Sequence, residues 1–187
     1  ANAIANCTGD FCWSPDARHL FWVFRDDNGR PAKIYRRAAG GGEDTLVYDE
    51  PDEGFFLSVT TSESREFILI SAGNGAQSET YTIPASDPTT APTLFHAREP
   101  ELLYTPTHWD GRWHVLTNAD DAVDFKIMCC APGDTARGQW REFVPHQQGR
   151  YILGLHATKD YLVRAERANA LPRIVVDTDY LTYFKAS

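Results

Sequence analysis

Short apolar runs recur along the chain at a nearly constant spacing. Three of them, at residues 19–24, 66–71 and 113–117, each follow or begin next to an arginine, and these arginines lie 47 residues apart, at positions 18, 65 and 112. A fourth run, at residues 160–163, lies 48 positions further on. A repeat of this length that contains several short strands is typical of the blades of a β-propeller.

Turn-forming residues divide each repeat into four candidate strands. Asn28-Gly29 suits a tight hairpin because both positions accept positive φ, so the second and third strands should be antiparallel neighbours. Prolines 51, 100 and 145 fall between repeats, where a missing amide proton does no harm. The predicted strands are 10–13, 20–25, 32–37 and 45–49; 55–60, 66–71, 78–83 and 93–97; 102–107, 113–117, 124–130 and 140–144; and 151–155, 161–165, 173–177 and 181–185.

The second strand of each repeat is apolar at consecutive positions, as in residues 20–24 and 67–70. Such a run is buried on both faces, which occurs when each sheet lies between two others, whereas a two-sheet sandwich alternates more strictly. Residues 158–170 also have near-helical spacing, but their register with the other repeats favours a strand.

The fold class expected from these patterns is all-β, a partial β-propeller of about four four-stranded antiparallel blades. The blades are expected at residues 10–50, 54–98, 101–147 and 150–187, in a single propeller segment that covers residues 1–187. The two terminal blades would expose apolar faces that neighbouring blades normally cover, so we expect the isolated chain to self-associate.

Composition narrows the partners. A net charge of −8 and a pI near 5.2 argue against binding to nucleic acid or anionic lipid, although an acidic surface can favour cationic substrates through its field. The apolar runs are too short to span a membrane, and no signal segment opens the chain, so we expect a cytoplasmic protein with no membrane partner. The chain begins at Ala1 and its one methionine is Met128, which is expected of a processed or truncated piece.

No constellation of reactive residues emerges, so no catalytic, cofactor-binding or metal-binding residue is predicted. The cysteines at positions 7 and 12, together with Cys129 and Cys130, lack the spacing of a zinc site and are expected to be reduced core residues. His108 and His114 have no third ligand at suitable spacing, and the acidic residues 120, 121 and 124 do not fit a calcium loop. A Gly-x-Ser-x-Gly nucleophile motif is absent from the sequence.

Several short sequence motifs resemble motifs in the propeller of oligopeptidase B (protease II), a group within the prolyl oligopeptidase family. They occur in the family's order over nearly the whole chain. These motifs are Trp13-Ser14-Pro15-Asp16 with Leu20-Phe21-Trp22-Val23, Leu46-Val47-Tyr48-Asp49-Glu50, Phe55-Phe56-Leu57-Ser58 with Thr60-Thr61-Ser62, Thr117-Asn118 with Asp124-Phe125-Lys126-Ile127, and Gln139-Trp140-Arg141-Glu142 with Pro145-His146.

The resemblance implies that the chain is part of a seven-bladed ring that caps an α/β-hydrolase domain. That catalytic domain, absent from this chain, would carry a Ser-Asp-His triad and cleave short peptides after Arg or Lys, and the propeller would act as a gate that filters substrates. The expected partners are therefore the catalytic domain and peptide substrates. The alternative is a free-standing propeller that binds other proteins, since the fold alone does not decide function; a small β enzyme has no convergent polar groups to support it.

Overall fold

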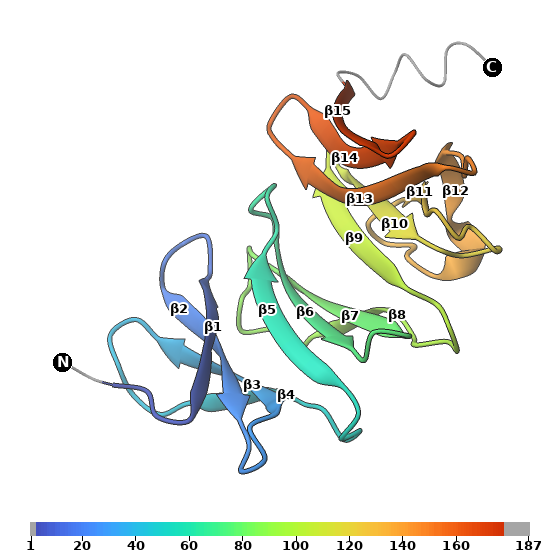
Figure 1. The fold of residues 1–187 in the computed structure, drawn as a ribbon. Helices are drawn as coiled ribbons and strands as arrows, with labels where there is room; N and C mark the ends of the chain where they lie inside the picture. The colour runs from blue at the N-terminus through green and yellow to red at the C-terminus, as the bar shows by residue number, and fades with distance from the viewer. Residues whose placement is uncertain (1–2, 178–187) are drawn as a thin grey trace. The chain divides into compact units, whose positions relative to one another are not determined.

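The computed structural model describes residues 3–177, and within this range the regular elements are β-strands and one short 3-10 helix. The chain divides into two compact units, Ala1–Glu101 and Leu102–Ser187. Each unit contains two antiparallel sheets (Figure 1). The predicted all-β class, built from repeated antiparallel sheets, is confirmed; the strand predicted at 181–185 lies outside the described residues.

The first unit contains eight strands in two sheets, with the strands of each sheet in sequential order. Sheet one, shown in blue in Figure 1, contains β1 (Cys7–Trp13), β2 (His19–Arg25), β3 (Pro31–Ala38) and β4 (Thr45–Asp49). Sheet two contains β5 (Phe56–Thr61), β6 (Phe67–Gly73), β7 (Ser78–Pro84) and β8 (Thr93–His96). These eight strands agree with the predicted ones to within three residues at either end.

The β2–β3 hairpin forms where the Asn-Gly pair predicts it. Gly29 has a φ of 82°, and the Asp26 carboxylate accepts backbone hydrogen bonds from Asn28 and Arg30 at 3.0 and 2.9 Å. The carboxylate therefore satisfies two amide groups that the turn leaves outside the sheet ladder. β2 and β3 pair antiparallel, as expected.

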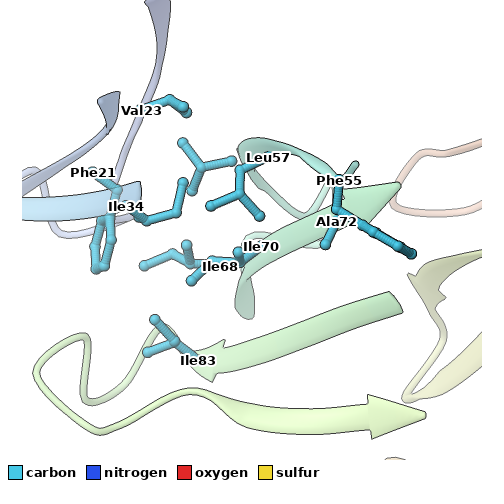
Figure 2. Close-up of a cluster of buried hydrophobic side chains, with 10 residues drawn as sticks. Phe21, Val23, Ile34, Phe55, Leu57, Ile68, Ile70, Ala72 and Ile83 are labelled. Atoms are coloured by element: carbon cyan, nitrogen blue, oxygen red, sulfur yellow. The ribbon is translucent and has the colours of Figure 1, made fainter. Parts of the chain in front are cut away.

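The core of the first unit lies between its two sheets. Alternate residues of the middle strands of sheet one, Phe21, Val23 and Ile34, are fully buried against the isoleucines of sheet two (Figure 2). The isoleucines are Ile68 and Ile70 from β6 and Ile83 from β7, also fully buried. This packing explains why every second position of the apolar run in β2 is hydrophobic, since these side chains all lie on the face that meets the other sheet.

The other half of the β2 pattern has a different cause. Trp22 is on the opposite face of sheet one, yet it is 5% exposed, because the Tyr35 ring stacks on it with centroids 5.1 Å apart and Phe24 contacts both rings edge-on. Its indole N–H donates to the Asp44 carboxylate at 3.2 Å. Within the first unit, burial on this face therefore comes from side chains of the same sheet rather than from a second neighbouring sheet.

The repeat that the arginines suggested is shifted by one residue. The turn before β2 is closed by Ser14, whose amide bonds to the His19 carbonyl at 2.8 Å, and the turn before β6 is closed in the same way by Ser62 and Phe67. In both turns the serine hydroxyl also accepts the amide of the first strand residue at 3.0 Å. These turns are 48 residues apart, so Arg65 corresponds in space to Ala17 rather than to Arg18, and both positions have positive φ.

The second unit repeats the plan. Sheet three contains β9 (Tyr104–Trp109), β10 (Arg112–Thr117), β11 (Lys126–Cys130) and β12 (Arg141–Val144), and the 3-10 helix η1 (Arg137–Gln139) precedes β12. Sheet four contains β13 (Arg150–Ala157), β14 (Leu162–Ala168) and β15 (Leu171–Asp177). Leu116, Ile127, Phe143, Ile152 and Leu162 form the core between these two sheets.

The segment with near-helical spacing is a strand, as its register indicated. β14 pairs with β13 on one side and with β15 on the other. Asn169 and Ala170 form the two-residue turn that follows, and both have positive φ, at 51° and 63°. A turn of this kind matches the twist of a hairpin, which fixes the β14–β15 register. No helix within the described residues is long and apolar enough to cross a membrane.

Candidate functional site

The first strands of sheets one and two, β1 and β5, are joined by two hydrogen bonds, and a third joins the turns that follow them. The Val59 amide donates to the Asp10 carboxylate at 3.2 Å, and the Thr61 hydroxyl donates to the Trp13 carbonyl at 2.7 Å. At the end of this seam, Arg65 donates to the Pro15 carbonyl at 3.1 Å. Since a strand edge presents unpaired N–H and C=O groups, these bonds close the edges of β1 and β5 against each other.

The face of β5 that points away from the core carries Phe56, Ser58 and Thr60, all exposed, and they alternate with the buried Leu57 and Val59. None of the three exposed side chains ionises at neutral pH. In a propeller, the first strands surround the central channel. This surface can make apolar contacts and neutral hydrogen bonds to an extended peptide, and it offers no group for acid–base or nucleophilic chemistry.

A buried ion cluster joins the two sheets of the first unit at their outer strands. Arg98, which follows β8, binds Glu50 at 2.8 Å and Glu79 at 2.6 Å. The Glu50 side chain is 0% exposed and that of Glu79 is 8% exposed. The guanidinium also lies 3.7 Å from the centroid of the Phe55 ring. We refer to Glu50, Glu79 and Arg98 as the Arg98 cluster.

Two tyrosines complete the hydrogen bonding of the Arg98 cluster. The Tyr48 hydroxyl donates to Glu50 at 3.1 Å and the Tyr81 hydroxyl donates to Glu79 at 3.3 Å, while their rings lie with centroids 4.6 Å apart. Burial, a hydrogen bond with Tyr81 and the Glu50 charge together raise the pKa of Tyr48 far above its usual value. Both phenols therefore remain donors, which a buried carboxylate pair needs.

Arg30 fixes the linker between the two sheets. Its guanidinium donates to the carbonyl oxygens of Asp52 at 3.0 Å and Phe55 at 3.2 Å, and its Nε bonds to Asp26 at 3.2 Å. One side chain from the β2–β3 hairpin thus satisfies backbone groups of the linker that have no strand partner.

The second unit contains a cluster of opposite composition. Glu166, fully buried on β14, binds Arg164 at 3.1 Å and Arg173 at 2.5 Å, and Arg150 lies 3.9 Å from it. Arg164 also pairs with Asp177 at 2.7 Å. Burial by itself raises the pKa of Glu166, but the hydrogen bonds from Arg173 and Arg164 outweigh it and hold the pKa below its usual value. This carboxylate stays ionised and is structural.

His108 and His114, considered above as possible metal ligands, each pack against an aromatic ring. The His108 ring meets Trp113 edge-on with centroids 4.8 Å apart, and His114 meets Phe143 in the same way at 4.8 Å. Burial lowers the pKa of His114, and together with smaller effects of the nearby His108 and Arg112 in the same direction it brings this pKa to about 4. His114 is therefore neutral at physiological pH.

Across residues 3–177, no group of three or more His, Cys, Asp and Glu side chains is arranged to hold a metal ion. The four cysteines are free thiols, and Cys129 and Cys130 are buried, as expected. Burial raises the pKa of Cys12 to about 11 and that of Cys130 to about 12, so neither is a thiolate near neutral pH.

The Arg98 cluster is not among the features predicted from the sequence. A signal was present, because Glu50 and Arg98 are 48 residues apart and lie one and two residues after the fourth strand of their repeats. Opposite charges at equivalent repeat positions indicate an ion pair between adjacent sheets. Glu79, on β7, has no such signal, since its position relative to Arg98 depends on the register of β8 against β7, which shifts between Thr80 and Tyr81.

Comparison with known proteins gives a consistent result. The family described as prolyl oligopeptidase, N-terminal β-propeller domain, matches residues 1–180. Dipeptidyl aminopeptidase BI of Pseudoxanthomonas mexicana is 32% identical over 94% of the chain, and protease 2 of Moraxella lacunata is 27% identical over 91%. These matches cover 24% and 25% of the two relatives, so the chain spans about a quarter of their length.

Solved structures show the same fold. Oligopeptidase B from Leishmania major aligns with 97% of the chain at a TM-score of 0.88 and 22% sequence identity. Oligopeptidase B from Trypanosoma brucei, in a closed form with covalently bound antipain, aligns with 95% at the same TM-score and 21% identity. The chain covers 26% of each of these proteins.

Replacing Arg98 should destabilise the first unit strongly. Arg98→Met leaves Glu50 and Glu79 buried without a counter-charge, and we expect the free energy of unfolding to fall by about 3 kcal/mol. Urea denaturation followed by tryptophan fluorescence measures this loss. Adding Glu50→Gln and Glu79→Gln to the same variant should restore part of it, because the buried charges are then removed.

Lys33→Met is the matched control for this experiment. Lys33 pairs with Asp49 at 2.9 Å, but both side chains are well exposed, so the loss should stay within about 1 kcal/mol. Equal losses in the free energy of unfolding for the two variants would show that burial does not increase the cost of breaking the Arg98 cluster.

His114 should make stability depend on pH between 6.5 and 4. Its folded pKa of about 4 lies below the unfolded value of 6.5, so the unfolded state takes up a proton first as the pH falls through this window. The stability that His114 contributes is complete above pH 6.5 and is lost on acidification, by on the order of 3 kcal/mol at pH 4.

Denaturation curves of the wild type and His114→Phe at several pH values test this prediction. The wild type should lose stability more steeply than the variant between pH 6.5 and 4. His156→Phe, at an exposed position of β13, serves as the control and should keep the wild-type slope. Parallel curves for wild type and His114→Phe would rule out the buried neutral histidine as the cause.

Proposed function

Because the chain belongs to the family of the prolyl oligopeptidase N-terminal β-propeller domain, we propose that it is the non-catalytic gating segment of an oligopeptidase B-like serine peptidase. The parent enzyme would cleave short peptides after Arg or Lys. The observation that carries this proposal is the family match over residues 1–180, in a chain that spans about a quarter of its relatives. The catalytic domain of the parent is the proposed partner.

The geometry of the first unit supports a passive role in the reaction. Its buried carboxylates Glu50 and Glu79 are held by Arg98, and burial keeps the Cys12 thiol protonated by raising its pKa to about 11, so the unit offers walls and contacts rather than reactive atoms. A cover of this kind keeps folded proteins and bulk water away from an active site while short peptides enter. The seam between β1 and β5 determines how firmly the first-strand wall is closed.

The charge of the chain supports a basic substrate class. A net charge of −8 creates a field that attracts cationic peptides and raises their rate of encounter. Four free thiols fit a reducing compartment, and we propose a cytoplasmic location for the parent.

The function is tested in the full-length parent enzyme. A short peptide ending in Arg or Lys at the cleavage site should be cleaved with a kcat/KM at least about 100-fold above that of the matching proline peptide. Asp10→Ala removes the acceptor of the Val59 amide, and it should raise the cleavage rate of peptides of about 40 residues several-fold while leaving the short substrate unchanged.

Asp49→Ala, on the exposed outer strand β4, is the control and should change neither rate. The chain by itself should show no turnover. A preference for proline would overturn the proposed specificity, and an unchanged rate on long peptides in Asp10→Ala would overturn the role of the seam in gating.

We also propose that the isolated chain self-associates through sheet four. Ile174 and Val176 on β15 are 73% and 51% exposed, and Leu153 on β13 is exposed as well. Ile174 and Val176 lie on the face opposite to Arg173 and the core. An exposed apolar sheet face of this kind is normally covered by another protein surface.

Light scattering over a range of concentrations should show a mass that rises above that of the monomer for the isolated chain. Ile174→Asp should shift this association to at least about tenfold higher concentration, because it places a charge in the apolar face. Gln148→Asp adds the same charge in an exposed loop and should leave the association unchanged. A monomeric wild-type chain at high concentration would contradict the proposal.

A further inference from the structure

A concave pocket of about 470 Å³ lies in the second unit, at one end of sheet three. Its walls come from the start of β10, the end of β11 and the loop between β11 and β12. The residues of the β1–β5 seam and of the Arg98 cluster do not line this pocket. The pocket is large enough for one or two amino-acid residues.

The loop that forms one wall is ordered by its own hydrogen bonds. The Asp134 amide bonds to the Ala131 carbonyl at 3.1 Å, and the Trp140 amide closes the 3-10 turn on Arg137 at 3.1 Å. The Trp140 indole, which is buried, donates to the Thr135 carbonyl at 2.8 Å. Compact loops fixed in this way hold their side chains in defined positions and are frequently functional.

Arg141, the first residue of β12, presents a positioned but uncompensated charge to the pocket. Its Nη1 donates to the carbonyl oxygens of Gly138 at 3.0 Å and Trp140 at 3.1 Å, which fixes the guanidinium without neutralising it. In the part of the chain that the structure describes, Arg141 forms no salt bridge. A guanidinium fixed through one nitrogen retains donors for a second, anionic partner, and little side-chain entropy is lost when it binds.

The remaining lining groups restrict the partner. Arg112, at the start of β10, adds a second guanidinium, and Asp134 adds one carboxylate, so two of the three charged side chains that line the pocket are cationic. Cys130 contributes a buried thiol, whereas the side chain of Cys129, on the opposite face of β11, packs in the core between sheets three and four. Burial raises the pKa of Cys130 to about 12, with Cys129 and Asp134 acting in the same direction and Arg112 against them. This thiol is therefore neutral and forms a soft, weakly polar surface.

We propose that this pocket binds the terminal carboxylate of a short peptide, with Arg141 and Arg112 as its cationic partners and the thiol-lined surface beside the last side chain. A carboxylate fits better than a phosphate because Asp134 repels a doubly charged anion. The carboxylate chemistry rests on the pocket alone. The choice of a peptide as its carrier rests on the proposed function, in which the parent enzyme handles short peptides.

Titration of the isotopically labelled chain, observed by NMR, tests the proposal with N-acetyl-leucine as the probe. Signals of residues 129–141 should shift and saturate at millimolar concentrations, as expected for a ligand of this size. N-acetyl-leucinamide has the same shape without the charge and should cause no saturable shift. Arg141→Gln should weaken binding of the carboxylate at least about tenfold, since it removes a charge-assisted hydrogen bond.

Arg167→Gln, at an exposed position of β14 outside the pocket, is the control and should bind as the wild type does. Equal shifts with the carboxylate and the amide, or unchanged binding in Arg141→Gln, would overturn the site. Acetate binding as tightly as N-acetyl-leucine would overturn the assignment to a peptide. The titration involves no cleavage, so its failure and a failure of the proposed peptidase function are seen in separate measurements.

Discussion

Packing of sheet one against sheet two removes the side chains of Phe21, Val23, Ile68 and Ile70 completely from water. A four-stranded sheet with apolar residues on both faces of its central strands cannot satisfy them alone, so it requires another surface on each face. Where a second sheet supplies that surface, as here, the burial is cooperative between repeats. Where the sheet supplies it from its own face, as around Trp22, large aromatic rings lie flat over one another.

The polar contacts between sheets follow the same geometry as the apolar ones. The bonds of Thr61 to Trp13, Val59 to Asp10 and Arg98 to Glu50 link residues separated by 48 or 49 positions, which is one repeat. Buried charges add little stability over apolar residues of the same size, but they tolerate only one register. The Arg98 cluster therefore acts mainly to fix how sheets one and two align, whereas the arginines around Glu166 link the three strands of sheet four.

This arrangement accounts for a protein segment that binds and covers rather than reacts. Cys12 and Cys130 are protonated, His114 is neutral, and the buried carboxylates of Glu50, Glu79 and Glu166 are held by arginines. Among the groups that remain accessible in residues 3–177 are the neutral side chains along β5 and the guanidinium of Arg141. Both suit non-covalent contacts with a peptide, which agrees with membership in a family of peptidase propeller domains.

The sequence by itself determined the all-β class, the four-strand repeat and most strand positions, because alternation, turn chemistry and period are local properties of the chain. The Asn28-Gly29 hairpin and the strand at residues 162–168 are examples, since their turns specify φ directly. Only the tertiary structure decided which charges meet: Glu79 and Arg98 are 19 residues apart with no periodic relation, and their contact depends on the register of β8 against β7, which shifts between Thr80 and Tyr81. It also decided the phase of the repeat, because the serine turns that align the strands are defined by hydrogen bonds rather than by the more conspicuous arginines. Interactions between sheets depend on orientation in three dimensions, and a linear pattern does not encode it.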